Sequence, residues 1–326
     1  MKNFTQKYIK SFDGKPLCVY TSNNNTSNSD KTIIVLHGMA DHIERYEEFL
    51  NKLIDNNFKV IAYNQRGHYL TDTAENYGIL GDFTHPSNPK LSCNDGFMNL
   101  IYDLDFLVNL VKTENSEQIF LFGHSMGSFV VTRYLQMFAD KIKAAVLCGT
   151  GKNPQIKVIM GNLIAKTICL FKCENYRSKL IDKLSFGTYN NKFKPTRTDF
   201  DWLNTVDNEV DKYINDPWCG GIFPAGFFRD FTKLMYKINL NNRLTNRFTS
   251  IFLISGDNDP VGNMGKSVKK LYNRLSKNNK KKNKNYTKNI DNNVTLSLIK
   301  NARHEILLEE KKEVIHNQII NWLNKQ

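Results

Sequence analysis

Short apolar runs alternate with helix-like patterns along most of this chain. Six runs of the continuous kind typical of buried strands are each followed by a helical pattern; they cover residues 32–38, 59–67, 118–125, 143–151, 250–259 and 294–302. Residues 7–12 and 17–22 flank Asp13-Gly14 and predict an amino-terminal hairpin. The alternation predicts an α/β fold: a mostly parallel central sheet with helices on both faces and active sites at the carboxyl ends of its strands.

The alternation breaks between about residues 152 and 245. Helical patterns and irregular segments rich in Pro, Gly and aromatic residues replace the strands there. We interpret residues 152–245 as a helical cap, or lid, inserted in the sheet and placed over its carboxyl edge. The 326 residues are then one domain, residues 1–326, because α/β architectures often reach this size as a single unit.

An apolar helical stripe lies within the expected cap. Over residues 156–172 the stripe holds Ile156, Met160, Leu163, Ile164, Ile168 and Phe171, with Asn162, Lys166 and Lys172 on the opposite side. Most stripes of this kind face a core, so packing on the body of the protein is the preferred interpretation. A lid that faces lipid is the alternative.

The motif Gly-His-Ser-Met-Gly stands where one predicted strand gives way to a helix, and it matches the G-x-S-x-G pattern of a nucleophile elbow. In such an elbow the serine, here Ser125, occupies a tight and strained turn. Gly123 and Gly127 leave room for that turn, and the N–H of Met126 at the helix start can meet a developing negative charge. Ser125 is therefore the candidate nucleophile, with His124 part of the supporting elbow.

A serine hydroxyl needs a histidine to take its proton and a carboxylate to orient that histidine. Elbow enzymes place both downstream, in the order Ser, Asp, His. His304 follows the last strand-like run and is the candidate base, whereas His316 falls in an amphipathic terminal helix. Asp259, also after a strand, is the candidate acid; Asp257 is the alternative, and a role in forming the turn stays open for either.

An oxyanion needs a second backbone donor beside Met126, and such donors come from the loop after an earlier strand. The segment "VLHGMADH" follows the first predicted parallel strand, so the N–H of Met39 is the candidate. His37 and Gly38 would shape this loop. A histidine beside a glycine is also common in plain turns, which is the alternative for His37.

Several motifs together resemble the monoacylglycerol lipase and lysophospholipase branch of the α/β-hydrolase superfamily. They are "HGMADHIERYEEF", "NQRGH", "FGHSMGS", "SGDNDPVG" and "ARHEILLE", joined in the cap by "KPTRTDFDWL" and "VDKYINDPWCG". The resemblance covers roughly residues 4–325, apart from one Lys/Asn-rich stretch. It implies an α/β-hydrolase fold and the site roles already assigned: Ser125 as nucleophile, Asp259 as acid, His304 as base, and Met39 and Met126 as oxyanion donors.

The chain departs from that family in two places. Asn64 and Tyr69 replace an acidic residue and a glycine, and Ala40 stands where many lipases of this branch have glycine. Neither departure touches the three candidate catalytic residues. Both leave the shape of the pocket, and with it the preferred acyl chain, open.

Positive charge is concentrated near the carboxyl terminus. Lys and Arg number 45 against 32 Asp and Glu, and ten of the positive residues lie between Lys266 and Lys288 without an acidic one among them. Residues 276–292 read as a low-complexity basic surface loop. Peripheral contact of residues 266–288 with an anionic membrane is the functional alternative, and we expect no nucleic acid partner.

Six cysteines, mostly within apolar runs, indicate reduced thiols rather than disulfides. Cys169 and Cys173 lack a nearby histidine or carboxylate pair, so we expect no metal site and no cofactor. The first residues contain no apolar signal core, and no window reaches the roughly 18 apolar residues of a membrane span. We therefore expect a cytoplasmic protein, with peripheral membrane contact open.

These features together predict a serine hydrolase that cleaves carboxylic esters of single-chain lipids, a lysophospholipid or a monoacylglycerol, through an acyl-enzyme intermediate. A general carboxylesterase for small soluble esters keeps the same chemistry and is the alternative. A non-catalytic binding protein on the same fold is a further alternative, which the intact order of Ser125, Asp259 and His304 disfavours.

Overall fold

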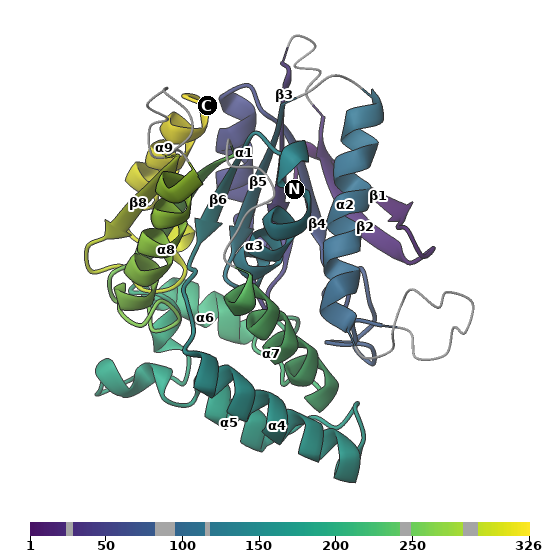
Figure 1. Cartoon of the computed structure of the whole chain (residues 1–326), viewed down its shortest axis with the longest axis vertical. Helices are drawn as coiled ribbons and strands as arrows, with labels where there is room; N and C mark the ends of the chain where they lie inside the picture. Colours follow the sequence, from purple (N-terminus) through teal and green to yellow (C-terminus); the bar gives the residue numbers. More distant parts are fainter. Residues whose placement is uncertain (24–28, 82–94, 115–117, 242–248, 283–292) are drawn as a thin grey trace.

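The computed structural model describes residues 1–23, 29–81, 95–114, 118–241, 249–282 and 293–326 (Figure 1). Within them, one sheet has the strand order β1-β2-β4-β3-β5-β6-β7-β8. The strands are β1 (Phe4–Lys10), β2 (Pro16–Ser22), β3 (Lys31–Leu36), β4 (Lys59–Asn64), β5 (Gln118–His124), β6 (Ala144–Cys148), β7 (Ser250–Gly256) and β8 (Val294–Ile299). Only the β1–β2 and β2–β4 pairs of this sheet are antiparallel, which confirms the predicted hairpin and the mostly parallel sheet.

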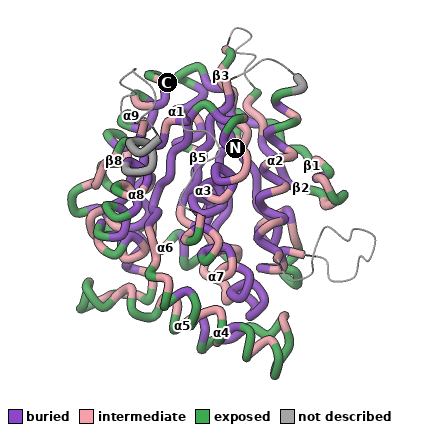
Figure 2. The backbone as a smooth tube through the Cα atoms, in the orientation of Figure 1, coloured by how far each residue is buried: buried purple, intermediate pink, exposed green. Residues whose placement is uncertain are grey.

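Helices cover both faces of the sheet, as predicted. The body helices are α1 (Glu47–Asp55), α2 (Gly96–Glu114), α3 (Met126–Phe138), α8 (Lys266–Lys282) and α9 (Lys312–Leu323). Alternate residues of β3 point to opposite faces of the sheet and so into two different cores. Ile33 and Val35 pack in the core formed with α1 and α9. Ile34 and Leu36 pack in the core formed with α2, α3 and α8. Burial on both faces explains why the central strands read as continuous apolar runs (Figure 2).

Between β6 and β7 the described residues form four more α-helices: α4 (Gln155–Lys172), α5 (Lys179–Phe186), α6 (Asp207–Asn215) and α7 (Ala225–Leu240). We refer to residues 149–241 as the β6–β7 segment. In Figure 1, α4 and α5 lie at the end of the molecule opposite the carboxyl terminus, and α7 lies between them and the sheet. The segment therefore places helices beyond one edge of the sheet rather than on its faces.

Helix α4 turns only part of the predicted apolar stripe toward the body. Ile164 and Ile168 are partly buried against the core, as the preferred interpretation expects. The other four members of the stripe are exposed: Ile156 (69%), Met160 (58%), Leu163 (66%) and Phe171 (76%). Packing on the body is wrong for these four because a different side of α4 meets α7, where Asn162 donates to the Arg229 carbonyl oxygen at 2.8 Å. Ala165 is buried there, and a Cβ added to Gly161 would lie 3.4 Å from Thr232 Cγ2.

Helix α8 continues into the expected basic loop. It ends at Lys282, so the first seven residues of the stretch 276–292 are helical. The remainder, 283–292, lies outside the described residues, and so does Cys93. Among the residues that are described, no helix has both the length and the hydropathy needed to cross a membrane.

Candidate active site

Ser125 lies in a tight turn between the last residue of β5 and the first residue of α3. Its backbone has φ 50° and ψ −116°, a left-handed conformation that costs a non-glycine residue about 1–3 kcal/mol. The two motif glycines let the backbone segments around the turn approach one another closely. A Cβ on Gly123 would lie 2.5 Å from the Gly127 carbonyl oxygen, and a Cβ on Gly127 would lie 2.7 Å from the His37 carbonyl oxygen. The turn leaves Ser125 partly exposed while the residues around it are buried.

His304 and Asp259 form a buried pair at the carboxyl ends of β8 and β7. His304 Nδ1 donates a hydrogen bond of 3.0 Å to Asp259 Oδ1. The same carboxylate accepts from the Val261 N–H at 2.8 Å and from the Ser255 hydroxyl at 3.0 Å, so both of its oxygens are held. Burial by itself would lower the pKa of His304, but the charge of Asp259 and its hydrogen bond raise that pKa above the ordinary 6.5.

Asp257, the alternative acid, has a different partner. Its Oδ1 accepts a hydrogen bond of 2.7 Å from the Asn301 N–H, in the turn that follows β8. The two aspartates therefore differ in their contacts: Asp257 stabilises the turn after β8, and Asp259 contacts His304.

The ring of His304 lies against the elbow. Its centroid is 4.8 Å from that of His124, the residue before Ser125. A Cβ on Gly149 would lie 3.1 Å from both His304 Cε1 and His124 Nε2, and the preceding residue, Cys148, accepts the Ser125 N–H at 2.9 Å. The sequence-predicted serine, histidine and aspartate are thus brought together at one edge of the sheet.

The loop after β3 packs directly on Ser125. A Cβ on Gly38 would lie 3.3 Å from Ser125 Cβ, so a larger residue would press on the serine. His37 holds the loop from within: Nδ1 donates to the Gly38 carbonyl oxygen at 2.7 Å, and Nε2 accepts from the Gln65 N–H at 3.0 Å. Burial lowers the pKa of His37 to about 4, which keeps it neutral in both contacts.

The two candidate oxyanion donors, the N–H groups of Met39 and Met126, are not used in hydrogen bonds to the rest of the described chain. Met126 is the first residue of α3, where helical N–H groups have no partner within the helix. Met39 follows Gly38, which meets Ser125. Both donors therefore belong to segments that meet at Ser125, and neither N–H group is engaged elsewhere in the described chain.

A ring of buried polar contacts that no sequence motif marks joins the loop after β3, the elbow and the histidine. The Tyr46 hydroxyl donates to Asp41 Oδ2 at 2.7 Å and lies 2.8 Å from His124 Nδ1. His124 Nε2 lies 3.2 Å from the His304 carbonyl oxygen. Burial, with the nearby charge of His304, lowers the pKa of His124 to about 4, so its ring stays neutral.

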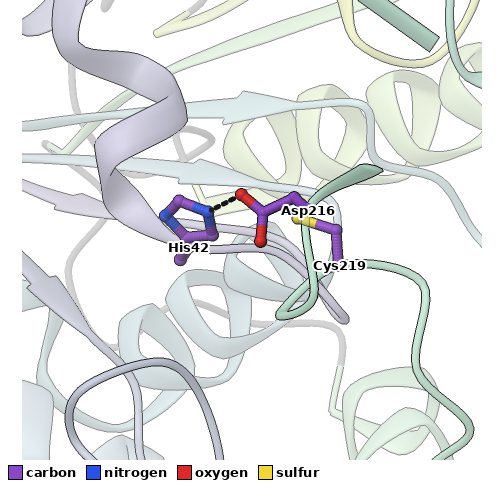
Figure 3. A group of neighbouring side chains, drawn as sticks. All are labelled: His42, Asp216 and Cys219. Atoms are coloured by element: carbon purple, nitrogen blue, oxygen red, sulfur yellow. Dashed lines mark hydrogen bonds and ion pairs between the residues drawn. The ribbon is translucent and has the colours of Figure 1, made fainter. Parts of the chain in front are cut away.

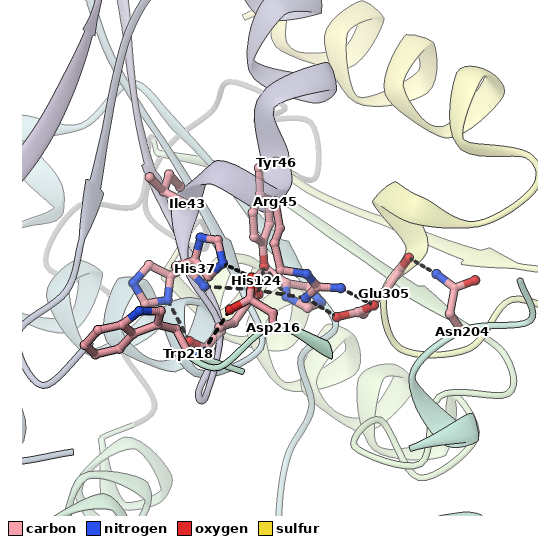
Figure 4. A network of polar contacts seen from close by, with 12 residues as sticks. His37, Ile43, Arg45, Tyr46, His124, Asn204, Asp216, Trp218 and Glu305 are labelled. Atoms are coloured by element: carbon pink, nitrogen blue, oxygen red, sulfur yellow. Dashed lines mark hydrogen bonds and ion pairs between the residues drawn. The ribbon is translucent and has the colours of Figure 1, made fainter. Parts of the chain in front are cut away.

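Arg45 closes this ring (Figure 4). It donates two hydrogen bonds to the Glu305 carboxylate, at 2.6 and 3.0 Å, and a third to Asp41 Oδ1 at 3.0 Å. Glu305 follows His304 directly, so the guanidinium ties the histidine loop to the loop after β3. The four-residue spacing of Asp41 and Arg45 was a signal for their pairing, but nothing local in sequence marked Glu305 as the partner.

The β6–β7 segment also contacts the histidine loop. The ring of Trp202, in the short 3₁₀ helix η4 (Asp201–Leu203), has its centroid 5.3 Å from that of His304. The Glu305 N–H donates to the Leu203 carbonyl oxygen at 2.7 Å, and Arg303 donates to the Asn204 carbonyl oxygen at 2.9 Å. One wall of the site is therefore built by the segment between β6 and β7.

A family model described as serine aminopeptidase, S33, matches residues 27–311, which is more than half of the chain. The chain belongs to this S33 family of α/β-hydrolases. The resemblance drawn from the motifs is confirmed at the level of the superfamily. The family description does not fix the substrate of an individual S33 member, because one fold supports many chemistries.

Two curated relatives match the S33 chain. A candidate monoglyceride lipase of Schizosaccharomyces pombe is 28% identical over 102 residues, 31% of this chain and 24% of that protein. An uncharacterised protein of Dictyostelium discoideum that contains an abhydrolase domain is 21% identical over 301 residues, 90% of this chain and 26% of that protein. The matched part is thus about a quarter of the length of each relative.

The solved structures support the fold of this S33 chain. A carboxyl esterase from Bacillus coagulans superposes with a TM-score of 0.84 at 22% identity, covering 99% of this chain and 98% of that one. Identity at this level establishes the fold alone. The predicted α/β-hydrolase fold is therefore confirmed.

Proposed function

We propose that this S33 protein is a serine hydrolase that cleaves carboxylic esters of single-chain lipids, either lysophospholipids or monoacylglycerols. One observation carries the proposal: the buried His304–Asp259 pair lies against an elbow that holds Ser125 in a strained turn. Ester hydrolysis needs no more than a nucleophile, a base with its orienting acid, and donors for the oxyanion. The relative from S. pombe bears the name of a lipase of this substrate class.

In the proposed reaction, Ser125 Oγ forms a bond to the acyl carbon while His304 takes the hydroxyl proton. The carbonyl oxygen becomes an oxyanion, which accepts hydrogen bonds from the Met39 and Met126 N–H groups. Collapse of this intermediate breaks the ester bond, and His304 gives its proton to the departing alcohol. Water, deprotonated by His304, then attacks the acyl-enzyme and releases the fatty acid.

An exposed apolar surface supports a lipid substrate. We call it the apolar face of α4 and α5, and it consists of Ile156, Ile159, Met160, Leu163, Leu170 and Phe171 in α4 with Leu180 and Leu184 in α5. The six α4 residues fall on one side of that helix by their spacing, and a large exposed apolar patch on a monomeric protein marks contact with lipid or another protein. Figure 2 shows many exposed residues, in green, along both helices at this end of the molecule.

Charge favours lipid over a second copy of the chain. Lys157, Lys166 and Lys172 on α4, with Lys179 and Lys183 on α5, are all exposed on the two helices that carry these apolar residues. A second copy would bring the same lysines together, whereas an anionic membrane attracts each by about 1 kcal/mol. We propose that residues 152–245 form a lid whose apolar face of α4 and α5 rests on an anionic membrane surface.

Replacing Leu163 and Phe171 together with serine is expected to weaken binding to vesicles containing phosphatidylserine about 10- to 100-fold, because two large apolar side chains leave the interface. Vesicle co-sedimentation measures this partition. The control is Val314→Ser on α9, a side chain 68% exposed but far from α4, which should bind like the wild type. Equal binding by the double variant, or dimerisation of the wild type that the same variant abolishes, contradicts a membrane role for this face.

Acyl-chain length separates the proposed function from its alternative, a general carboxylesterase. A lipid hydrolase is expected to give a kcat/KM that rises with chain length from acetyl to oleoyl monoesters, with a further rise above the micelle threshold. Release of free acid from each ester on one enzyme sample measures it. Rates that peak at the shortest chains, with no rise at the threshold, contradict the lipid assignment and leave ester hydrolysis itself standing.

A further inference from the structure

Three side chains of different chemistry meet near the loop after β3: His42, Asp216 and Cys219 (Figure 3). Each offers one donor atom, and the three atoms lie within 4.8 Å of one another. His42 directly precedes η1 (Ile43–Tyr46), while Asp216 caps the end of α6 and Cys219 follows in the next turn. The chain folds 174 residues back on itself to bring Asp216 Oδ2 to 2.9 Å from His42 Nε2.

We propose that these three residues bind a divalent zinc ion. Imidazole nitrogen, carboxylate oxygen and thiolate sulfur are the ligands that zinc takes in proteins. Tetrahedral coordination with bonds of about 2.0–2.3 Å puts neighbouring donor atoms about 3.3–3.7 Å apart. The separations in the cluster bracket this spacing, from 2.9 Å between His42 Nε2 and Asp216 Oδ2 up to the 4.8 Å within which all three donor atoms lie. On binding, the ion replaces the proton of the Cys219 thiol and the hydrogen bond between His42 and Asp216.

The surroundings suit three protein ligands with a fourth, solvent ligand. His42 and Cys219 are buried, but the Asp216 side chain is 27% exposed, which gives the ion a route from solvent. The backbone N–H of Trp218 donates to Asp216 Oδ1 at 2.9 Å, so the other carboxylate oxygen, Oδ2, is left for the metal. The Tyr69 ring packs on His42 with centroids 4.7 Å apart, which holds the imidazole in place.

This site is not the Cys169 and Cys173 pair considered from the sequence, because its ligands come from two segments that are distant along the chain. One is the loop that carries Met39, and the other connects α6 to α7. These segments already meet through the Gly220 N–H, which donates to the Ala40 carbonyl oxygen at 3.2 Å. A bound zinc ion would cross-link the oxyanion loop to the β6–β7 segment and raise the unfolding temperature.

The test titrates chelator-treated full-length protein with Zn²⁺ against a chromophoric competitor, and with Co²⁺ followed by absorption. The wild type is expected to bind one equivalent of Zn²⁺, and Co²⁺ to give a thiolate charge-transfer band. Cys219→Ser is expected to lose the band and to bind Zn²⁺ at least about tenfold more weakly. Cys173→Ser, which removes an exposed thiol directly after α4, is the matched control and should keep both properties.

A second measurement guards against a misfolded variant. Asp216→Asn keeps the size of a partly exposed side chain, and Zn²⁺ is expected to raise the unfolding temperature of the wild type but not of this variant. Absence of stoichiometric binding in the wild type overturns the proposal. Binding and stabilisation that survive in Cys219→Ser and Asp216→Asn overturn it equally, as does binding that is lost only in Cys173→Ser.

Discussion

Replacing Ser125 with alanine is expected to lower kcat for ester hydrolysis by about 10⁴-fold or more, with the fold intact. The loss follows from removal of the only atom that forms the acyl bond in the proposed reaction, and nucleophile deletions in serine hydrolases have effects of this size. Alanine keeps the Cβ that the elbow already accommodates at φ 50°, so the unfolding temperature should change little. Turnover of a chromogenic ester, with labelling by a fluorophosphonate probe, measures the effect.

The control for this prediction is Ser22→Ala, which makes the same chemical change on β2. The Ser22 hydroxyl oxygen accepts from the Val60 N–H at 3.1 Å and has no contact with the elbow. This variant should keep wild-type turnover and probe labelling. Substantial turnover in Ser125→Ala, or a probe adduct on another residue, would show that the nucleophile has been misassigned.

Asp259→Asn is expected to lower kcat/KM by about 10³- to 10⁴-fold, because the amide cannot stabilise the His304 imidazolium or fix its tautomer. Asp257→Asn is the matched control: its carboxylate contacts the Asn301 N–H instead of the histidine, so activity should stay near that of the wild type. Steady-state kinetics on one soluble ester compare the two. The reverse order of effects would make Asp257 the orienting acid.

The pH profile gives an independent readout of the same pair. His304 accepts a proton only when neutral, so wild-type kcat/KM should fall as the pH drops through the His304 pKa, which lies above 6.5. The charge of Asp259 is a main cause of that raised pKa, so in Asp259→Asn the acid limb should move to lower pH. An unchanged limb would mean that another group controls the profile.

Much of the fold could be predicted because parallel strands carry a strong local signal. Residues 33–36 and 119–122 are buried on both faces of the sheet, and this double burial requires unbroken apolar runs. The elbow motif is a second local signal, because its five residues alone predict that Ser125 lies at the end of a strand. Candidate partners could then be chosen from the few histidines and aspartates that follow later strands.

Contacts between distant residues could not be predicted where no recognisable motif implies the pairing. The contact of Arg45 with Glu305 joins residues 260 positions apart, and His42 meets Asp216 across 174 positions. Neither pairing leaves a trace in local spacing.

The orientation of α4 failed for a different reason. Periodicity shows that a helix has an apolar side but not which side is buried. Here Gly161 and Ala165 allow α4 to pack closely on α7, and four of the six stripe residues remain exposed while Ile164 and Ile168 are partly buried. Small residues on one side of an otherwise apolar helix are the signal that would have corrected the assignment.

The proposed activity of this S33 protein, release of fatty acid from single-chain lipid esters at Ser125, can be measured directly. Free oleic acid is quantified from monooleoylglycerol and from oleoyl lysophosphatidylcholine side by side, with Ser125→Ala as the blank. The wild type is expected to turn over at least one of the two lipids, and the variant neither above background. No turnover of either lipid by an enzyme that still reacts with a fluorophosphonate at Ser125 would contradict the proposed activity and would move the substrate to small esters.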